Sequence, residues 1–241
     1  MKKTLMITLL SSAALMLFAT SADAKTFDDQ TDVGVSFKSD GPNDPGKNIP
    51  YKDNLSLVWK PAAFEFGEQK AVGNSATFSN IVEGNQYVVV NDDRADDALT
   101  GWELSAKMSK LTSVSGSKTL ASKLTFNLGD GQSYRITDDP TVLNDKNDYI
   151  VNDPNTSGVL GKLEDAGIKL GDGASKSIEL VAGDTTSKTI LGKEKANGTK
   201  GGVATLIKDT KLVVADAKKD NAAGESFTGT VTWTLDDLVG N

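Results

Sequence analysis

The segment that most constrains the fold is residues 227–235, FTGTVTWTL, in which threonine alternates with apolar residues or glycine. A period of two with β-branched and aromatic residues is typical of a β-strand with one buried face. Its Trp and Leu are two residues apart and therefore share that face. The same W-x-L spacing occurs once more, at residues 102–104. The two pairs are Trp102 with Leu104 and Trp233 with Leu235.

Short alternating runs recur along the rest of the chain, with Gly, Pro, Asn and Asp between them. This pattern favours an all-β fold, specifically an antiparallel β-sandwich with long polar loops and at most one or two short helices. The strong pattern of residues 227–235 predicts that this strand docks inside a sheet. The other predicted strands are residues 33–37, 55–59, 64–66, 76–78, 86–91, 101–108, 120–128, 133–136, 177–181, 202–207 and 210–214.

Three connections carry more specific predictions. The polar turn at residues 91–97 predicts a hairpin between the strands on either side of it. Gly129-Asp-Gly131 supplies residues that tolerate positive φ, so we expect a reversal there. Residues 163–167 have enough helical spacing for one or two helical turns.

The first 24 residues have the layout of a secretory signal peptide. Two lysines precede an apolar run, and Ala22-Asp-Ala24 fits the small-x-small cleavage pattern. We therefore expect a signal peptide at residues 1–24 and a single domain at residues 25–241. The apolar run is too short for a membrane span, so no membrane insertion is predicted. The sequence predicts a secreted protein that is held non-covalently.

The expected mature chain is acidic. Without Lys2, Lys3 and Asp23 it has 24 basic and 32 acidic residues, a net charge of −8. This charge argues against nucleic acid as a partner, because phosphate neutralisation needs clustered Lys and Arg. It also argues against a purely ionic attachment to an anionic wall or membrane surface.

The chain contains no Cys and no His. It therefore needs a real hydrophobic core, and it lacks the parts of Ser-His-Asp and Cys-His catalysis. A pair of carboxylates could still cleave a carbohydrate. The acidic stretch at residues 145–153 starts like a calcium loop, but Ile150 stands where that loop requires Gly. We predict no enzyme, no catalytic residue, no metal site and no cofactor.

The W-x-L residues have two readings. Trp and Leu on one strand face are most often core. Alternatively, the two Trp rings lie together at a surface or cleft, where an indole face stacks on sugar rings. The spacing alone leaves both open, so Trp102, Leu104, Trp233 and Leu235 are candidates for either ligand binding or fold definition.

The chain resembles the WxL-domain cell-surface proteins of low-GC Gram-positive bacteria. The resemblance rests on GWELS at residues 101–105 after VVVNDDR at 88–94, and on the terminal GTVTWTL at 229–235. It implies a β-rich domain that brings the two W-x-L segments together and attaches non-covalently to the cell wall, with peptidoglycan as the ligand. It also implies partner proteins at the cell surface, including membrane-anchored ones, and a role in surface complexes or adhesion. The alternative is a module that binds a partner surface protein and reaches the wall only through it, by strand addition at a sheet edge.

Overall fold

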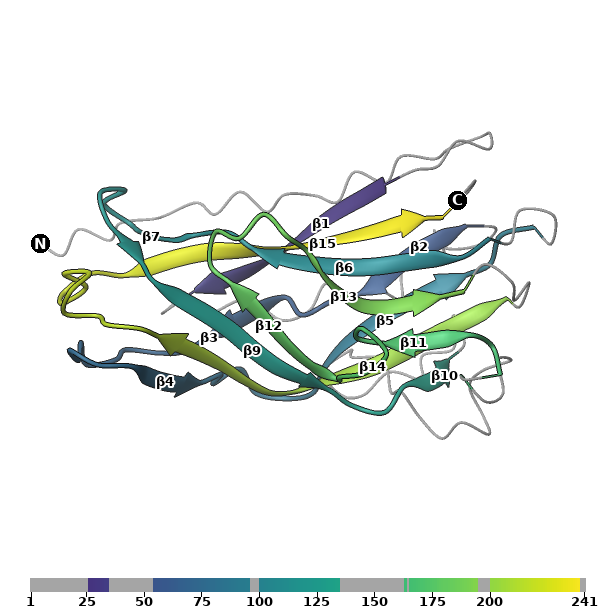
Figure 1. Ribbon diagram of the computed structural model, residues 1–241, viewed down its shortest axis with the longest axis horizontal. Helices are drawn as coiled ribbons and strands as arrows, with labels where there is room; N and C mark the ends of the chain where they lie inside the picture. The colour runs from purple at the N-terminus through teal and green to yellow at the C-terminus, as the bar shows by residue number, and fades with distance from the viewer. Residues whose placement is uncertain are drawn as a thin grey trace, which may run out of the picture.

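The computed structural model of the chain describes residues 26–34, 54–95, 100–134, 163, 165–194 and 200–238. Within 26–34 the Thr31 side chain is the one described, and at Tyr134 the backbone alone is described. These residues form two stacked sheets and no helix (Figure 1). The prediction of an all-β sandwich is confirmed. No helix in the described ranges is long and apolar enough to cross a membrane.

The eight-stranded sheet has the order β11-β13-β6-β15-β1-β3, with β7 paired to β15 and β8 to β7. All its pairs are antiparallel except that of β1 with β3. β15 lies between β6 and β1, which confirms that this strand docks inside a sheet. The strands are β1 (Thr26–Gly34), β3 (Ala63–Glu65), β6 (Trp102–Met108), β7 (Leu111–Ser113), β8 (Thr119–Leu120), β11 (Ile168–Leu170), β13 (Lys188–Lys193) and β15 (Phe227–Asp237).

The seven-stranded sheet has the order β12-β9-β14-β5-β2, with β10 and β4 also paired to β14. β14 is its longest strand and pairs with β5, β9, β4 and β10 along its length. The strands are β2 (Leu55–Trp59), β4 (Ala76–Ser79), β5 (Gln86–Asp92), β9 (Ser122–Leu128), β10 (Gln132–Tyr134), β12 (Ser177–Val181) and β14 (Gly201–Val214).

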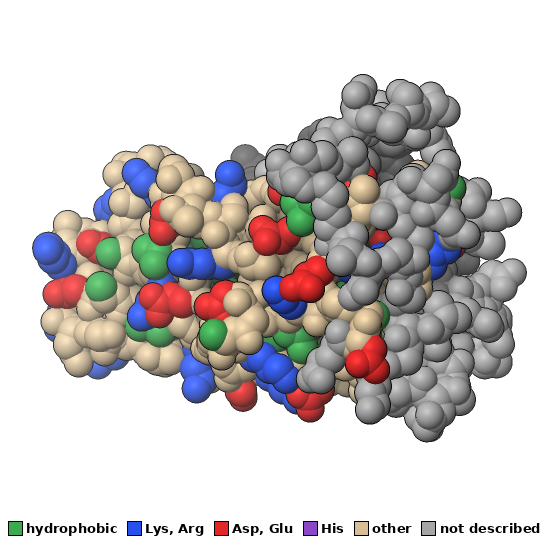
Figure 2. Space-filling view, turned by 45° about the vertical axis from the view of Figure 1, so that its right-hand side comes forward, with side chains coloured by type: hydrophobic (Ala, Val, Ile, Leu, Met, Phe, Trp, Pro, Cys, Tyr) green, Lys and Arg blue, Asp and Glu red, His purple; other side chains and the backbone are tan. Residues whose placement is uncertain are grey.

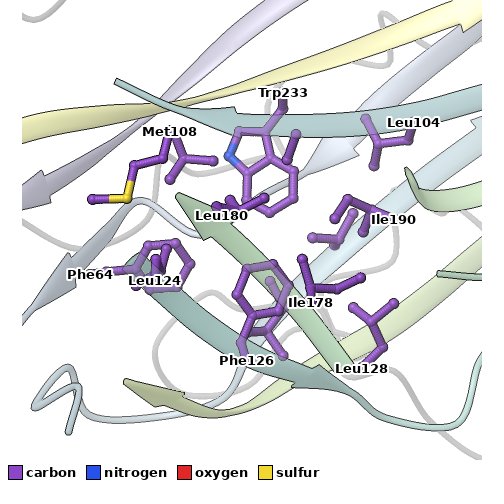
Figure 3. Packing of buried hydrophobic residues seen from close by; sticks show 14 of the residues in the cluster. Phe64, Leu104, Met108, Leu124, Phe126, Leu128, Ile178, Leu180, Ile190 and Trp233 are labelled. Atoms are coloured by element: carbon purple, nitrogen blue, oxygen red, sulfur yellow. The ribbon is translucent and has the colours of Figure 1, made fainter. Parts of the chain in front are cut away.

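A single hydrophobic core fills the space between the sheets. The inward positions of β6 and β15 face those of β9, β12 and β5, and these side chains are almost fully buried. Figure 3 shows Trp233 pointing into this space towards Phe126, whose ring centroid lies 6.5 Å from that of the indole. Because the chain has no disulfide to rely on, this packing is what opposes the entropy of unfolding.

Several local predictions are wrong. β5 and β6 are not a hairpin, since β5 belongs to the seven-stranded sheet and β6 to the other. Both β9 and β10 pair antiparallel with β14, so they run in the same direction and the chain does not reverse at residues 129–131. In each case the glycine or polar residues end a strand, but hydrophobic burial across the sandwich selects its partner.

Two other regions also differ from prediction. The expected strands 202–207 and 210–214 are one strand, β14, with a register shift between Lys208 and Lys211. The described residues of 163–167 form a turn and no helix. The pattern missed β7, β11 and β13, of which β7 and β11 are three residues long. Residues 35–37 of the first predicted strand lie outside the described residues; that strand is observed as β1 at Thr26–Gly34.

Candidate functional site

The two W-x-L segments lie side by side as β6 and β15. Their register places Leu104 opposite Leu235 and Trp233 opposite Ala106, while Trp102 lies opposite Asp237. All four motif side chains are at most 1% exposed. The structure thus joins the two motifs into one W-x-L seam on the inner face of the eight-stranded sheet.

The Trp233 indole is fully enclosed and has a polar partner. Its N–H donates to the Thr31 hydroxyl at 2.5 Å, and that hydroxyl donates to the Pro61 carbonyl at 2.7 Å. Thr31 lies on β1 and is itself fully buried. The hydrogen-bond chain therefore ties the seam to the first strand and to the segment before β3.

The Trp102 indole has no such partner. It is 1% exposed, and its Nε1 makes no hydrogen bond in the described part of the chain. An unsatisfied buried N–H costs about 1–3 kcal/mol. The ring's apolar burial offsets this cost, because fully burying an aromatic side chain contributes about 1.5–3 kcal/mol.

A buried charge network closes the end of the sandwich where the seam begins, at the right in Figure 1. The Arg94 Nε and one terminal nitrogen bind the two carboxylate oxygens of Asp92 at 2.8 and 2.9 Å. The other terminal nitrogen lies 2.6 Å from Asp237, and Lys193 Nζ lies 3.1 Å from Asp92. Thr100 donates its hydroxyl hydrogen to Asp237.

This network joins the two sheets. Asp92 ends β5 of the seven-stranded sheet, whereas Lys193 and Asp237 lie in the other sheet on either side of Trp102. Two cations face two anions, so the buried charges balance. Burial lowers the pKa of the Arg94 guanidinium, but hydrogen bonds to Asp92 and Asp237 outweigh burial, and the pKa lies above its ordinary value. Arg94 therefore stays charged.

A surface depression of about 360 Å³ lies over the same end of the eight-stranded sheet. Its central row is Glu103, Gly192 and Lys169, which are cross-strand neighbours on β6, β13 and β11. They alternate with the buried Trp102, so the row faces outward. Glu103 is half-buried, and its side-chain carboxylate makes no hydrogen bond or ion pair within the described residues.

Gly192 makes this depression possible. A Cβ at this position would meet nothing nearer than the Trp102 carbonyl oxygen at 3.6 Å, an ordinary contact. The space is therefore open, and the backbone of the W-x-L strand lies beneath it. Leu238 and Thr189 add one apolar and one hydroxyl group to its lining.

Fold and motif geometry together define a β-sandwich in which the two W-x-L strands pair with each other inside one sheet. The chain matches the family described as WxL domain surface cell wall-binding over residues 25–238, nearly its whole length, and it belongs to this family. The protein is therefore located at the cell wall, on the cell surface. No curated protein and no solved structure matches the chain.

The charge network is the part of this site that the sequence pattern missed. Asp92 and Arg94 have opposite charges, lie two residues apart and stand in the polar stretch before the first W-x-L strand. Opposite charges at this spacing were a usable signal for an ion pair at the end of the strand. The acidic stretch 145–153 and Asp96 and Asp97 lie outside the described residues. Among the residues that the structure describes, no group of three potential metal ligands occurs.

Proposed function

We propose that the domain binds peptidoglycan directly and non-covalently, as a binding module and not as an enzyme. The observation that carries this proposal is the match to a cell wall-binding family over residues 25–238. We also propose that residues 1–24 are a signal peptide and that residues 25–241 form one domain. The match begins where the predicted cleavage would leave the chain, which supports this division.

The W-x-L seam supports wall binding by defining the fold and not by touching the glycan. Its four side chains are buried between the sheets, where a polymer as large as peptidoglycan has no access. By packing in the core, the seam instead fixes the position of β6. The outward-facing residues of β6, which include Glu103, are thereby held in place on the outer surface of the sheet. Ligand contact therefore belongs to the outer surface.

The Gly192 depression is the contact surface that we propose. Its size lies at the lower end of the range for small-molecule sites, about 300–1,000 Å³. A glycine floor lets a sugar ring approach the sheet, and the Glu103 carboxylate can accept hydrogen bonds from sugar hydroxyl groups. The charged residues that line the depression are of both signs, and acidic and basic side chains are likewise mixed over the described part of the face in Figure 2. A lining of mixed sign favours neutral contacts over an ionic one.

Filling the depression tests this assignment. Gly192→Val adds a β-branched side chain where the strand has room for it, so the variant should fold. We expect it to pellet with protein-free peptidoglycan at least threefold less than the parent chain. Ser79→Val, at an exposed position of β4 in the other sheet, is the matched control and should pellet like the parent. If all three proteins pellet equally, the depression is not part of the contact surface.

The second candidate function is binding to other cell-surface proteins, including membrane-anchored ones, in surface complexes or adhesion. The observation that favours it is the edge position of β12, which among the described strands pairs with β9 alone and carries the 44% exposed Val181. An extended segment of a partner could add to this edge. If the chain stays in solution with protein-free peptidoglycan but pellets with protein-bearing walls, this function replaces direct glycan binding.

A further inference from the structure

Most of the charged side chains that line the depression over β6, β11 and β13 already have partners. Lys169 pairs with Glu194 at 2.5 Å, and Lys193 pairs with the buried Asp92 at 3.1 Å. The Asp172 carboxylate accepts hydrogen bonds from backbone N–H groups of the turn that follows it. These groups are committed to the protein's own structure, so they offer little to a ligand.

Two polar side chains in the lining have no such partner. The Glu103 carboxylate and the Thr189 hydroxyl are both half-buried, and neither makes a hydrogen bond or ion pair within the part of the chain that the structure describes. An ionised carboxylate only accepts hydrogen bonds, whereas a threonine hydroxyl can donate one. The depression therefore presents one free acceptor and one free donor to a ligand.

A β-bulge places Thr189 on the same face as Glu103. The pairing of β13 with β6 shifts its register between Thr189 and Leu191. Ile190 and Leu191 are both fully buried, so the extra residue keeps two consecutive side chains in the core. Without it, strict alternation would turn Thr189 inward. Bulges re-aim side chains in this way and are common beside functional sites.

The two free groups stand on either side of a gap floored by Gly192. Glu103 lies opposite Gly192 and Thr189 lies opposite Ser105, so Glu103 and Thr189 are diagonal neighbours. Diagonal neighbours in antiparallel sheets are about 7–8 Å apart. This separation has room for a small group that makes hydrogen bonds of about 2.9 Å on both sides. Leu238 adds an apolar side chain to the lining.

A secondary amide fits this arrangement, because its planar trans geometry points the N–H and the C=O in opposite directions. A sugar hydroxyl could bond to either residue alone, and an ammonium group has no acceptor for Thr189. We propose that the depression is a subsite for the acetamido group of an N-acetylated amino sugar. This subsite rests on the proposed function, since the sugars of peptidoglycan strands carry acetamido groups.

Each part of the acetamido group then has its own contact. The amide N–H donates to the Glu103 carboxylate, and the Thr189 hydroxyl donates to the acetyl carbonyl oxygen. The methyl group contacts Gly192, where the nearest backbone atom leaves ordinary contact distance, and Leu238. Recognition of this kind is neutral on the ligand side, in keeping with the mixed charges of the lining.

Soluble tetrasaccharides of the same linkage test the subsite. Each sugar carries an acetamido group in tetra-N-acetylchitotetraose, an ammonium group in chitotetraose and a hydroxyl group in cellotetraose. Each compound is titrated into the isotope-labelled mature chain, and the backbone amide NMR signals of Glu103, Thr189 and Gly192 are followed. We expect the N-acetylated tetramer to shift these signals and to bind about tenfold more tightly than cellotetraose, the difference expected for one or two hydrogen bonds.

Two substitutions connect this preference to the named side chains. Thr189→Val keeps the β-branched shape and removes the hydroxyl, and Glu103→Ala removes the carboxylate. Each should abolish most of the preference for the N-acetylated tetramer over cellotetraose, a ratio that a merely structural role would not change. Thr232→Val, on the outward face of β15 and outside the depression, is the matched control and should keep the full preference.

Four outcomes overturn the proposal. They are equal affinity for the N-acetylated tetramer and cellotetraose, tighter binding of chitotetraose than of the N-acetylated tetramer, a preference that survives both substitutions, and no shift with any tetramer. If one of these occurs while the parent chain pellets with peptidoglycan, the acetamido subsite is wrong and wall binding stands. A parent chain that does not pellet contradicts the proposed function itself, so the two failures are distinguishable.

Discussion

Trp102 and Trp233 occupy the same motif position but have different polar surroundings. The Trp233 N–H is satisfied by Thr31, whereas the Trp102 N–H has no partner within the described residues. Both rings are buried to the same degree. At the scale of single residues, both motif Trp side chains therefore fill core volume, whereas the hydrogen bond of each depends on what the neighbouring strand supplies.

Thr31→Val should destabilise the domain by about 1–3 kcal/mol, because it leaves the buried Trp233 N–H and Pro61 carbonyl without their shared hydroxyl. Urea unfolding of Thr31→Val, Trp233→Phe and the double variant isolates the indole–hydroxyl term. We expect a coupling of about 1 kcal/mol. Additive losses in the double variant would show that this hydrogen bond contributes nothing.

Arg94→Met should destabilise the domain by about 3–5 kcal/mol, since it removes the bidentate partner of a buried carboxylate. Lys193→Met should cost less, because Asp92 keeps both of its bonds to Arg94. Urea unfolding monitored by Trp fluorescence measures both variants. A Lys193→Met loss as large as that of Arg94→Met would contradict this ranking.

At the scale of elements, alternation predicts where strands lie much better than it predicts their partners. The strand at 227–235 and its place inside a sheet follow from period two alone. The hairpin predicted for β5 and β6 fails because both strands bury one face, and each can do so in either sheet. β11 has three residues and lacks the length for a periodic signal.

The same limit applies to the candidate site. The sequence identifies the W-x-L residues, but whether they face a core or a cleft depends on what packs opposite them. Phe126, which packs against Trp233, comes from β9 of the other sheet. No pattern in the sequence reveals that these two residues meet. The network of Asp92, Lys193 and Asp237 joins three strands that are remote in sequence, so its assembly requires the fold.

The turn between β11 and β12 offers a matched pair of glycines. Both have positive φ, +63° at Gly171 and +84° at Gly173, but a Cβ at Gly171 would lie 2.1 Å from the Ser175 carbonyl oxygen. Gly173→Ala meets open space and should cost about 1–2 kcal/mol from backbone conformation alone. Gly171→Ala should cost clearly more in urea unfolding. Equal losses would show that the turn relaxes around the added methyl group.

At the scale of the whole molecule, stability should fall in acid. Hydrogen bonds from the Ser175 backbone N–H and from Lys118 lower the pKa values of Asp172 and Glu225, respectively. A bond from the Thr186 backbone N–H likewise lowers the pKa of Asp184. A carboxylate with a lowered folded pKa stabilises the fold above its unfolded pKa of about 4, and this contribution is lost as the pH falls through the folded value.

The urea midpoint should therefore decrease between neutral pH and about pH 3. Asp172→Asn removes one of these carboxylates and should flatten the profile without changing its direction. A midpoint that rises on acidification would mean that repulsion among the excess acidic side chains outweighs these hydrogen bonds.

The most direct test of wall binding is co-sedimentation of the mature chain with peptidoglycan stripped of protein and teichoic acid, measured as salt is raised and with a chelator. Residues 25–241 carry a net charge of −8, so we predict direct, neutral contacts, and the pelleted fraction should persist at high salt because such contacts are not screened. Loss at moderate salt or with the chelator would contradict a neutral contact, and a chain that never pellets would contradict direct glycan binding.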